Sequence, residues 1–193
     1  MNAQAQLVLD FWFGAPGSDE SGKDREVWFR KDEDFDAEFA RRFGPIIESA
    51  LAGGLDDWDA TPRGTLARIV VLDQFARNAF RGTPRAFAGD VFALAAARHL
   101  VADGADQPLA PYERSFAYLP FEHSEDLAAQ DMGMQLFTML ARQHPALEDS
   151  LKWSVLHRDV IARFGRFPHR NEILGRASTA EELAFLAQPG SRF

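Results

Sequence analysis

The spacing of apolar residues constrains the fold of this chain more than any other feature of its sequence. Over residues 33–52, phenylalanine and isoleucine recur at intervals of three and four, which places them on one face of an α-helix. Thr61-Pro62 has the cap and first-turn residues that begin a helix. The apolar run at 69–72 has the composition of a strand, but its flanks have helical spacing. The chain is therefore predicted to be all-α.

About eight segments share this helical pattern, and mostly short connections join them. Short connections bring consecutive helices together as antiparallel hairpins, so we predict one domain over residues 1–193. It should be a compact bundle or a right-handed stack of helix pairs. The charged stretch 14–32 is predicted to be a loop that Trp28 and Phe29 anchor to the core. The predicted helices cover residues 3–13, 33–52, 61 onward, 83–101, 112–118, 124–142, 145–164 and 178–186.

Three of these helices have recognisable ends. Ser124 is predicted to cap the helix over 124–142, and Gly165 to end the helix before it in a left-handed conformation. Ser178 and Glu181 have the spacing of a capping box at the start of the last helix.

Composition excludes several classes of function. The chain has no cysteine, which excludes a disulfide scaffold, a thiolate nucleophile and a cysteine-ligated metal site. Its formal net charge is −8, and the excess of acids lies in residues 1–60, which argues against nucleic acid as the main partner. No apolar run approaches the roughly 20 residues of a membrane span, and the N-terminus lacks the positive start of a signal peptide. We therefore expect a cytoplasmic protein that binds neither nucleic acid nor a membrane.

The first of three polar stretches follows the central apolar helix. Asp73 and Arg77 are four residues apart, as are Gln74 and Asn78, and Arg77 and Arg81, so each pair lies on adjoining faces if the helix continues. Polar side chains beside so apolar a helix should bind a ligand or another side chain and should not be simply solvated. Two interpretations stay open: a ligand site, and a buried Asp–Arg pair that joins two helices.

The second polar stretch contains Glu122 and His123, followed directly by Ser124. A carboxylate beside a histidine suggests a general acid–base pair or part of a metal site. The spacing does not favour a metal, because there is no His-Glu-x-x-His or Glu-x-x-His pattern, and no metal ligand is predicted. The alternative is a hydrogen-bonding role at a helix end. His157 either faces the same region or is a core histidine with its own partners.

The third polar stretch, residues 163–176, is the densest in hydrogen-bond donors. Arg166, His169, Arg170 and Asn171 lie in or beside Gly-Arg-Phe-Pro, a sequence that cannot continue a helix. Guanidinium groups beside free backbone amides suit a carboxylate or a phosphate. The alternative is that these arginines bond the carbonyl groups of helix ends and loops. Elsewhere there is no nucleophile elbow, P-loop or dinucleotide fingerprint, and no cofactor is predicted.

Motifs in these stretches resemble those of a bacterial family of unknown function, DUF924. The resemblance extends over nearly the whole chain and departs from the family pattern at Ala76, where the family usually has proline. It implies a tetratricopeptide-like all-α fold and carries no established activity. The matching segments are Leu9-Asp10-Phe11-Trp12-Phe13, Leu72-Asp73-Gln74-Phe75 with Arg77-Asn78, Phe80-Arg81-Gly82-Thr83-Pro84, Leu119-Pro120-Phe121-Glu122-His123-Ser124-Glu125, and Phe164-Gly165-Arg166-Phe167-Pro168-His169-Arg170-Asn171 with Leu174-Gly175-Arg176.

Three hypotheses about function follow. The favoured one is a binding module, in which donors that outnumber nearby acids hold a small anion or the carboxylate of a peptide terminus. The second is a hydrolytic or acid–base enzyme, in which Glu122 and His123, or His169, move protons while arginines orient an anionic substrate. The third is a purely structural network, with the function on another surface. The predicted ligand-binding residues are Asp73, Gln74, Arg77, Asn78, Arg81, Glu122, His123, Arg166, His169, Arg170 and Asn171.

Overall fold

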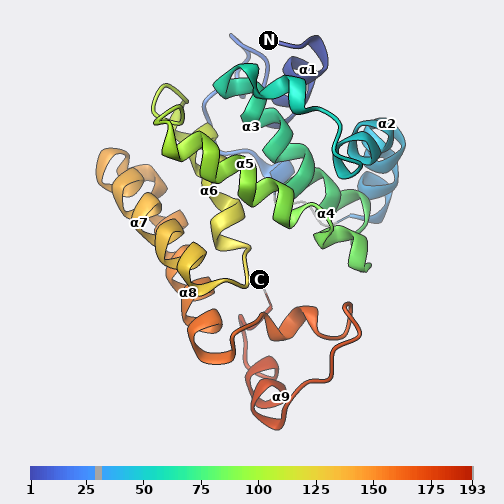
Figure 1. Ribbon diagram of the computed structural model, residues 1–193, viewed down its shortest axis with the longest axis vertical. Helices are drawn as coiled ribbons and strands as arrows, with labels where there is room; N and C mark the ends of the chain where they lie inside the picture. The colour runs from blue at the N-terminus through green and yellow to red at the C-terminus, as the bar shows by residue number, and fades with distance from the viewer. Residues whose placement is uncertain (29–31, 193) are drawn as a thin grey trace.

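The helix that begins at Pro62 lies at the centre of the larger part of the molecule, and the helices within residues 3–51 and 90–122 pack against it (Figure 1). It consists of α3 (Pro62–Val70), one π-helical turn (Val71–Phe75) and α4 (Ala76–Ala79). The hydroxyl of Thr61 accepts a hydrogen bond from the amide of Gly64, so the predicted start is confirmed. Every apolar side chain between residues 66 and 72 is buried, which explains why this segment also has the composition of a strand.

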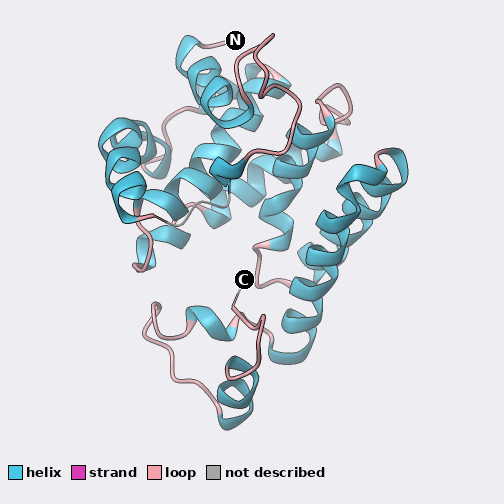
Figure 2. Ribbon diagram, turned by 180° about the vertical axis from the view of Figure 1, so that it is seen from behind, coloured by secondary structure: helices cyan, strands magenta, loops and turns pink. Residues whose placement is uncertain are grey.

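The remaining elements of the computed structural model, which describes residues 1–28 and 32–192, are also helical. With α3, the π turn and α4 counted as one, these described residues form eight α-helices and no strand (Figure 2). The all-α prediction is therefore confirmed. The other helices are α1 (Ala3–Phe13), α2 (Glu33–Leu51), α5 (Asp90–Ala102), α6 (Pro111–Glu122), α7 (Leu127–Gln143), α8 (Glu148–Phe164) and α9 (Ala180–Leu186).

Two predicted helices differ most from the structure in their bounds. The helix expected over 83–101 is divided: residues 84–87 form a 3-10 turn, and α5 begins only after Gly89. The helix expected over 112–118 continues to Glu122 although Pro120 lies inside it. Burial of the flanking Phe116 and Phe121 side chains in the core offsets the hydrogen bond that proline cannot donate.

Two predicted caps are also wrong, each by one or two residues. Asp126, not Ser124, caps α7, because its carboxylate accepts from the amide of Ala128. Thr179 with Glu182, not Ser178 with Glu181, forms the capping box of α9. The predicted end of α8 is confirmed, since Gly165 has a φ of +67°.

Aromatic side chains form the main core. Phe75 is fully buried, and its ring centroid lies 4.7 Å from those of both Phe39 and Phe43 and 5.5 Å from that of Trp12. Trp28 is buried in the same core, as predicted, whereas Phe29 lies outside the described residues. The core thus joins α1 and α2 to the central helix.

The part of the chain after α8 forms a separate end of the molecule. Residues 165–192, called here the C-terminal segment, include α9 and lie at the opposite end from α1 (Figure 1). A second, smaller apolar cluster of Val160, Ile161 and Phe167 joins this segment to α8. None of the helices among the described residues is long and apolar enough to cross a bilayer.

Candidate functional site

The π turn in the central helix positions Asp73. A Cβ on Gly89 would lie 2.2 Å from the carbonyl oxygen of Leu72, so only glycine lets the chain pass this close to the turn. The next residue, Asp90, begins α5. Glycine at this position therefore brings two carboxylates, Asp73 and Asp90, to the same side of the central helix.

Asp73 pairs with His123 at the end of α6. The Nδ1 atom of His123 lies 2.7 Å from Oδ1 of Asp73, and the side-chain amide of Gln74 donates to Oδ2. Burial alone would raise the pKa of Asp73, but the charge of Arg77 and the hydrogen bonds from His123 and the Gln74 side chain outweigh it and hold this pKa well below its usual range. Burial also lowers the pKa of His123, with a further contribution from Arg77. The pair is therefore an ionised aspartate that accepts a hydrogen bond from Nδ1–H of a neutral histidine.

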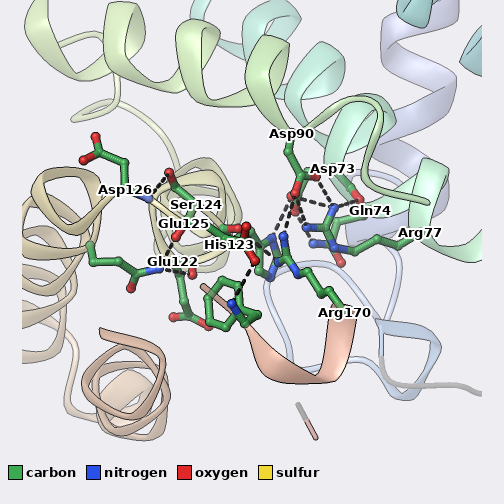
Figure 3. A network of polar contacts seen from close by, with 12 residues as sticks. Asp73, Gln74, Arg77, Asp90, Glu122, His123, Ser124, Glu125, Asp126 and Arg170 are labelled. Atoms are coloured by element: carbon green, nitrogen blue, oxygen red, sulfur yellow. Dashed lines mark hydrogen bonds and ion pairs between the residues drawn. The ribbon is translucent and has the colours of Figure 1, made fainter. Parts of the chain in front are cut away.

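Two arginines converge on Asp90 (Figure 3). Arg77 donates to both Asp90 oxygens, at 2.8 and 3.1 Å, and its Nη1 lies 3.1 Å from Oδ1 of Asp73. Arg170 donates to Asp90 at 3.2 Å and to the carbonyl oxygen of His123 at 3.0 Å. These five residues, called here the polar junction, join the central helix, α5 and α6 to the C-terminal segment.

Arg170 is held by aromatic rings as well as by hydrogen bonds. Its guanidinium carbon lies 4.6 Å from the ring centroid of Phe87 and 4.5 Å from that of Phe167, distances at which cation–π attraction operates. Burial, together with the nearby charge of Arg77, lowers the pKa of Arg170 to about 10. The arginine therefore stays charged at neutral pH and acts as the central link between the segments.

Glu122 points away from the polar junction and toward α8. It is 4% exposed, and its Oε1 lies 3.3 Å from Nδ1 of His157. Burial, with a smaller contribution from the charge of Asp73, raises the pKa of Glu122 to about 8. Burial lowers the pKa of His157 to about 3. At neutral pH this is consequently a contact between two largely uncharged groups.

A second carboxylate holds the C-terminal segment. Glu125 accepts from the backbone amide of Phe167 at 2.8 Å and from both Nη atoms of Arg176 at 2.7 and 2.9 Å. Arg176 also donates to the side chain of Asn171 at 2.9 Å. Residues of the third polar stretch therefore bind one another and Glu125, which lies just before α7.

The other predicted site residues lie outside the junction. Arg81 is paired with Asp36 and also donates to Asn78 at the edge of the central helix, while Arg166 is paired with Glu182. Asn171 donates to Ser178 within the C-terminal segment. The ring centroid of His169 lies 5.5 Å from that of Phe167, and burial, reinforced by Arg170, lowers the pKa of His169 to about 4.

The sequence reasoning missed the acids that neutralise these arginines. Arg81, Arg166 and Arg170 bind Asp36, Glu182 and Asp90, which are distant in sequence from their partners. Only Glu182 had a local signal, as the last residue of a Thr-x-x-Glu capping box. The predicted surplus of donors is therefore largely satisfied within the chain.

Two surface cavities lie elsewhere. One, of about 260 Å³, is lined by α8 and residues near the C-terminus, including Leu156, Phe164 and Phe185. The other, of about 360 Å³, lies in the acidic loop between Asp19 and Val27. Neither is lined by the polar junction, where His123 remains 16% exposed. In the described part of the chain, no group of three or more His, Asp and Glu side chains has the arrangement of a metal site.

Comparison with known proteins identifies the family. The family model described as "Bacterial protein of unknown function (DUF924)" matches residues 8–190. The chain belongs to the DUF924 family. A solved structure with the same fold is that of ATU0120, a protein of unknown function from Agrobacterium tumefaciens. It is 39% identical, with a TM-score of 0.83 over 96% of this chain and 97% of that one. The comparison with curated proteins finds no match.

The resemblance to DUF924 is thereby confirmed. Neither the family description nor that of the related structure names an activity, so membership of DUF924 does not establish a function.

Proposed function

We propose that the protein is a hydrolytic enzyme in which His123 acts as the general base and Asp73 orients it. The observation that carries this proposal is the 2.7 Å contact between His123 Nδ1 and Asp73 Oδ1. A carboxylate that accepts from Nδ1–H fixes the histidine tautomer and leaves the lone pair of Nε2 to take a proton. A depressed histidine pKa supports the role, because the free base is then present at neutral pH.

The nucleophile in this proposal is water. The chain has no cysteine, and the hydroxyl of Ser124 already accepts a hydrogen bond from the amide of Asp126. Of the predicted catalytic candidates, Glu122 is almost completely buried and faces α8, so the proposal assigns it no contact with substrate. Arg170 has the role of a positioning residue, since it donates to the carbonyl oxygen of His123.

Chemical modification tests this proposal without a known substrate. Diethyl pyrocarbonate reacts with an accessible, unprotonated imidazole nitrogen, and mass spectrometry locates the modified residue. We expect His123, which is 16% exposed, to react more slowly than His99, which is 69% exposed, and clearly faster than His157, which is 8% exposed. A His123 as slow to react as His157 would show that its Nε2 is closed to solvent and would contradict the proposal.

Activity is the second readout. A panel of small esters, amides and phosphoesters should include one that the protein hydrolyses, and His123→Gln should lower kcat/KM by roughly 10²–10⁴-fold, as removal of a general base does. His99→Gln is the matched control, since that histidine lies on the exposed face of α5. Equal turnover by both variants would exclude His123 as the base.

A second candidate is the predicted binding of a small anion or a peptide carboxylate in the cytoplasm. Arg77 and Arg170 meet at Asp90, and Nε of Arg170 is buried without a hydrogen-bond partner among the described residues, which supports the idea that this pair accepts another anion. A thermal-shift screen of carboxylates, phosphates and nucleotides should then find a stabilising compound whose effect disappears in Arg170→Ala. The tetratricopeptide-like arrangement of the helices and the cytoplasmic location likewise remain predictions.

A further inference from the structure

The carboxyl group of Glu122 lies against one turn of α8. Nδ1 of His157 is 2.9 Å from the carbonyl oxygen of Trp153 and 3.3 Å from Oε1 of Glu122. A carbonyl oxygen only accepts, so Nδ1 carries the proton and donates it in this direction. Oε1 of Glu122 thus lies near an N–H group, on the side of the carboxyl group where an acceptor oxygen is favoured.

The other carboxyl oxygen is buried without a partner. Oε2 of Glu122 is inaccessible to solvent and makes no hydrogen bond with the described residues. Because burial keeps Glu122 protonated at neutral pH and Oε1 faces an N–H donor, the proton belongs on Oε2. A buried O–H group without an acceptor destabilises the folded state, and such groups in native proteins usually contact an ordered water.

Ser154, three residues before His157 on α8, has a second buried and unpartnered polar group. It is fully buried, and its Oγ has no hydrogen-bond partner among the described residues. Ser154 lies one turn before His157 on the same face of α8, whereas its neighbours Trp153 and Val155 are 50% and 37% exposed on the outer face. Helical spacing therefore places its hydroxyl on the inner face of α8, the face from which His157 contacts Glu122.

We propose that one water molecule is bound between α6 and α8, where it accepts a hydrogen bond from Oε2–H of Glu122 and donates one to Oγ of Ser154. The two groups have complementary capacity, since the carboxyl group donates and the hydroxyl accepts. A neutral ligand is favoured because a cation in this position would require an ionised Glu122 in addition to the buried Asp73. The inference is independent of catalysis by His123.

A crystal structure of the wild-type protein at pH 6, at a resolution that shows ordered water, is the direct test. We expect one peak within about 2.6–3.2 Å of both Oε2 of Glu122 and Oγ of Ser154. A direct hydrogen bond from Ser154 to Glu122 with no such peak would overturn the proposal. A metal-like peak at shorter distances would overturn it as well.

A double-mutant cycle tests the same site in solution. In the wild-type background, Ser154→Ala should raise the unfolding equilibrium constant about fivefold, the equivalent of one hydrogen bond. In the Glu122→Met background the water has lost its donor, so Ser154→Ala should change this constant by much less. An equal effect in both backgrounds would show that no water couples the two side chains.

Matched variants distinguish loss of the bound water from general effects of a substitution on packing. Glu122→Gln keeps a donor at this position and should retain the water in its crystal structure, whereas Glu122→Met should lose it. Ser115→Ala is the control for removal of a buried hydroxyl, because the hydroxyl of Ser115 donates to the carbonyl of Tyr112 at 2.7 Å and needs no water. Its effect on stability should be the same in the wild-type and Glu122→Met backgrounds.

Discussion

Asp73 and Phe75 belong to the same π turn, and both are almost completely buried, yet they lie in opposite kinds of surroundings. Phe75 packs among aromatic rings of α1 and α2, while Asp73 lies among the arginines and histidine of the polar junction. Apolar contact is tolerant of geometry, whereas a buried charge is stable only with its particular partners present. The two regions should therefore differ in how they respond to substitution and to pH.

Removal of the central aromatic ring should have the largest effect. We expect Phe75→Ala to lower the free energy of unfolding by roughly 4–5 kcal/mol, because it leaves a cavity at the meeting point of several rings. Denaturant unfolding measures this change, which should be nearly the same at pH 5 and pH 9. Phe92→Ala, at a position 45% exposed, is the control and should cost less than about 1 kcal/mol. A strong dependence on pH would contradict the assignment of Phe75 to the apolar core.

Glu122 should make the free energy of unfolding sensitive to alkaline pH. Its pKa is about 8 in the folded protein, above the ordinary value of 4.5 expected after unfolding. The folded state therefore holds the proton more tightly, so this contribution to stability is complete below pH 4.5 and is lost as the pH rises through 8. Between pH 5 and pH 9, wild type should lose about 4 kcal/mol more than Glu122→Gln, which does not titrate. Parallel pH profiles for the two proteins would show that Glu122 is not held protonated.

Arg170 should matter most to the attachment of the C-terminal segment. Arg170→Ala leaves Asp90 with one arginine fewer and the carbonyl of His123 without its donor, so we expect a loss of about 3 kcal/mol. Hydrogen exchange should accelerate first in the C-terminal segment and last around Phe75. Arg98→Ala is the control, because that arginine is 53% exposed in its pair with Asp126 and should contribute little. Uniform acceleration along the chain would show that the junction and the core unfold together.

The same contrast explains how far the sequence could be interpreted. Helices could be predicted because apolar spacing and Pro/Gly signals are local, and the segments at 3–13 and 33–52 agree with α1 and α2 to within one residue. Helix ends were harder to predict when neighbouring residues could both act as the cap, as with Ser178 and Thr179. The division at Gly89 depends on close contact with Leu72, which no local pattern contains.

For the candidate site, the sequence predicted which residues take part but not which of them pair with one another. Asp73, Arg77, His123 and Arg170 were all among the predicted site residues, each from a different local signal or pair, and they do meet. Asp90 was missed because its partner Arg170 is 80 residues away, and an acid in the first turn of a helix has an ordinary local explanation. Long-range partners of this kind depend on packing, which determines whether a donor-rich loop faces a ligand or a carboxylate of its own chain.

The smallest predicted effect concerns the C-terminal segment alone. The hydroxyl of Thr179 accepts from the amide of Glu182, whose carboxylate in turn accepts from the amide of Thr179 and also binds Arg166. Thr179→Ala should cost about 1 kcal/mol, the usual contribution of such a cap. Because the segment is attached through ion pairs, hydrogen exchange should quicken in α9 while the amides around Phe75 keep their protection. Thr138→Ala, which removes a hydroxyl bonded only to a carbonyl of its own helix, should leave both regions unchanged. If Thr179→Ala instead lowered hydrogen-exchange protection around Phe75 as much as in α9, the two regions would unfold as one cooperative unit. The difference between an apolar core and an ion-paired segment would then have no effect on the order of unfolding.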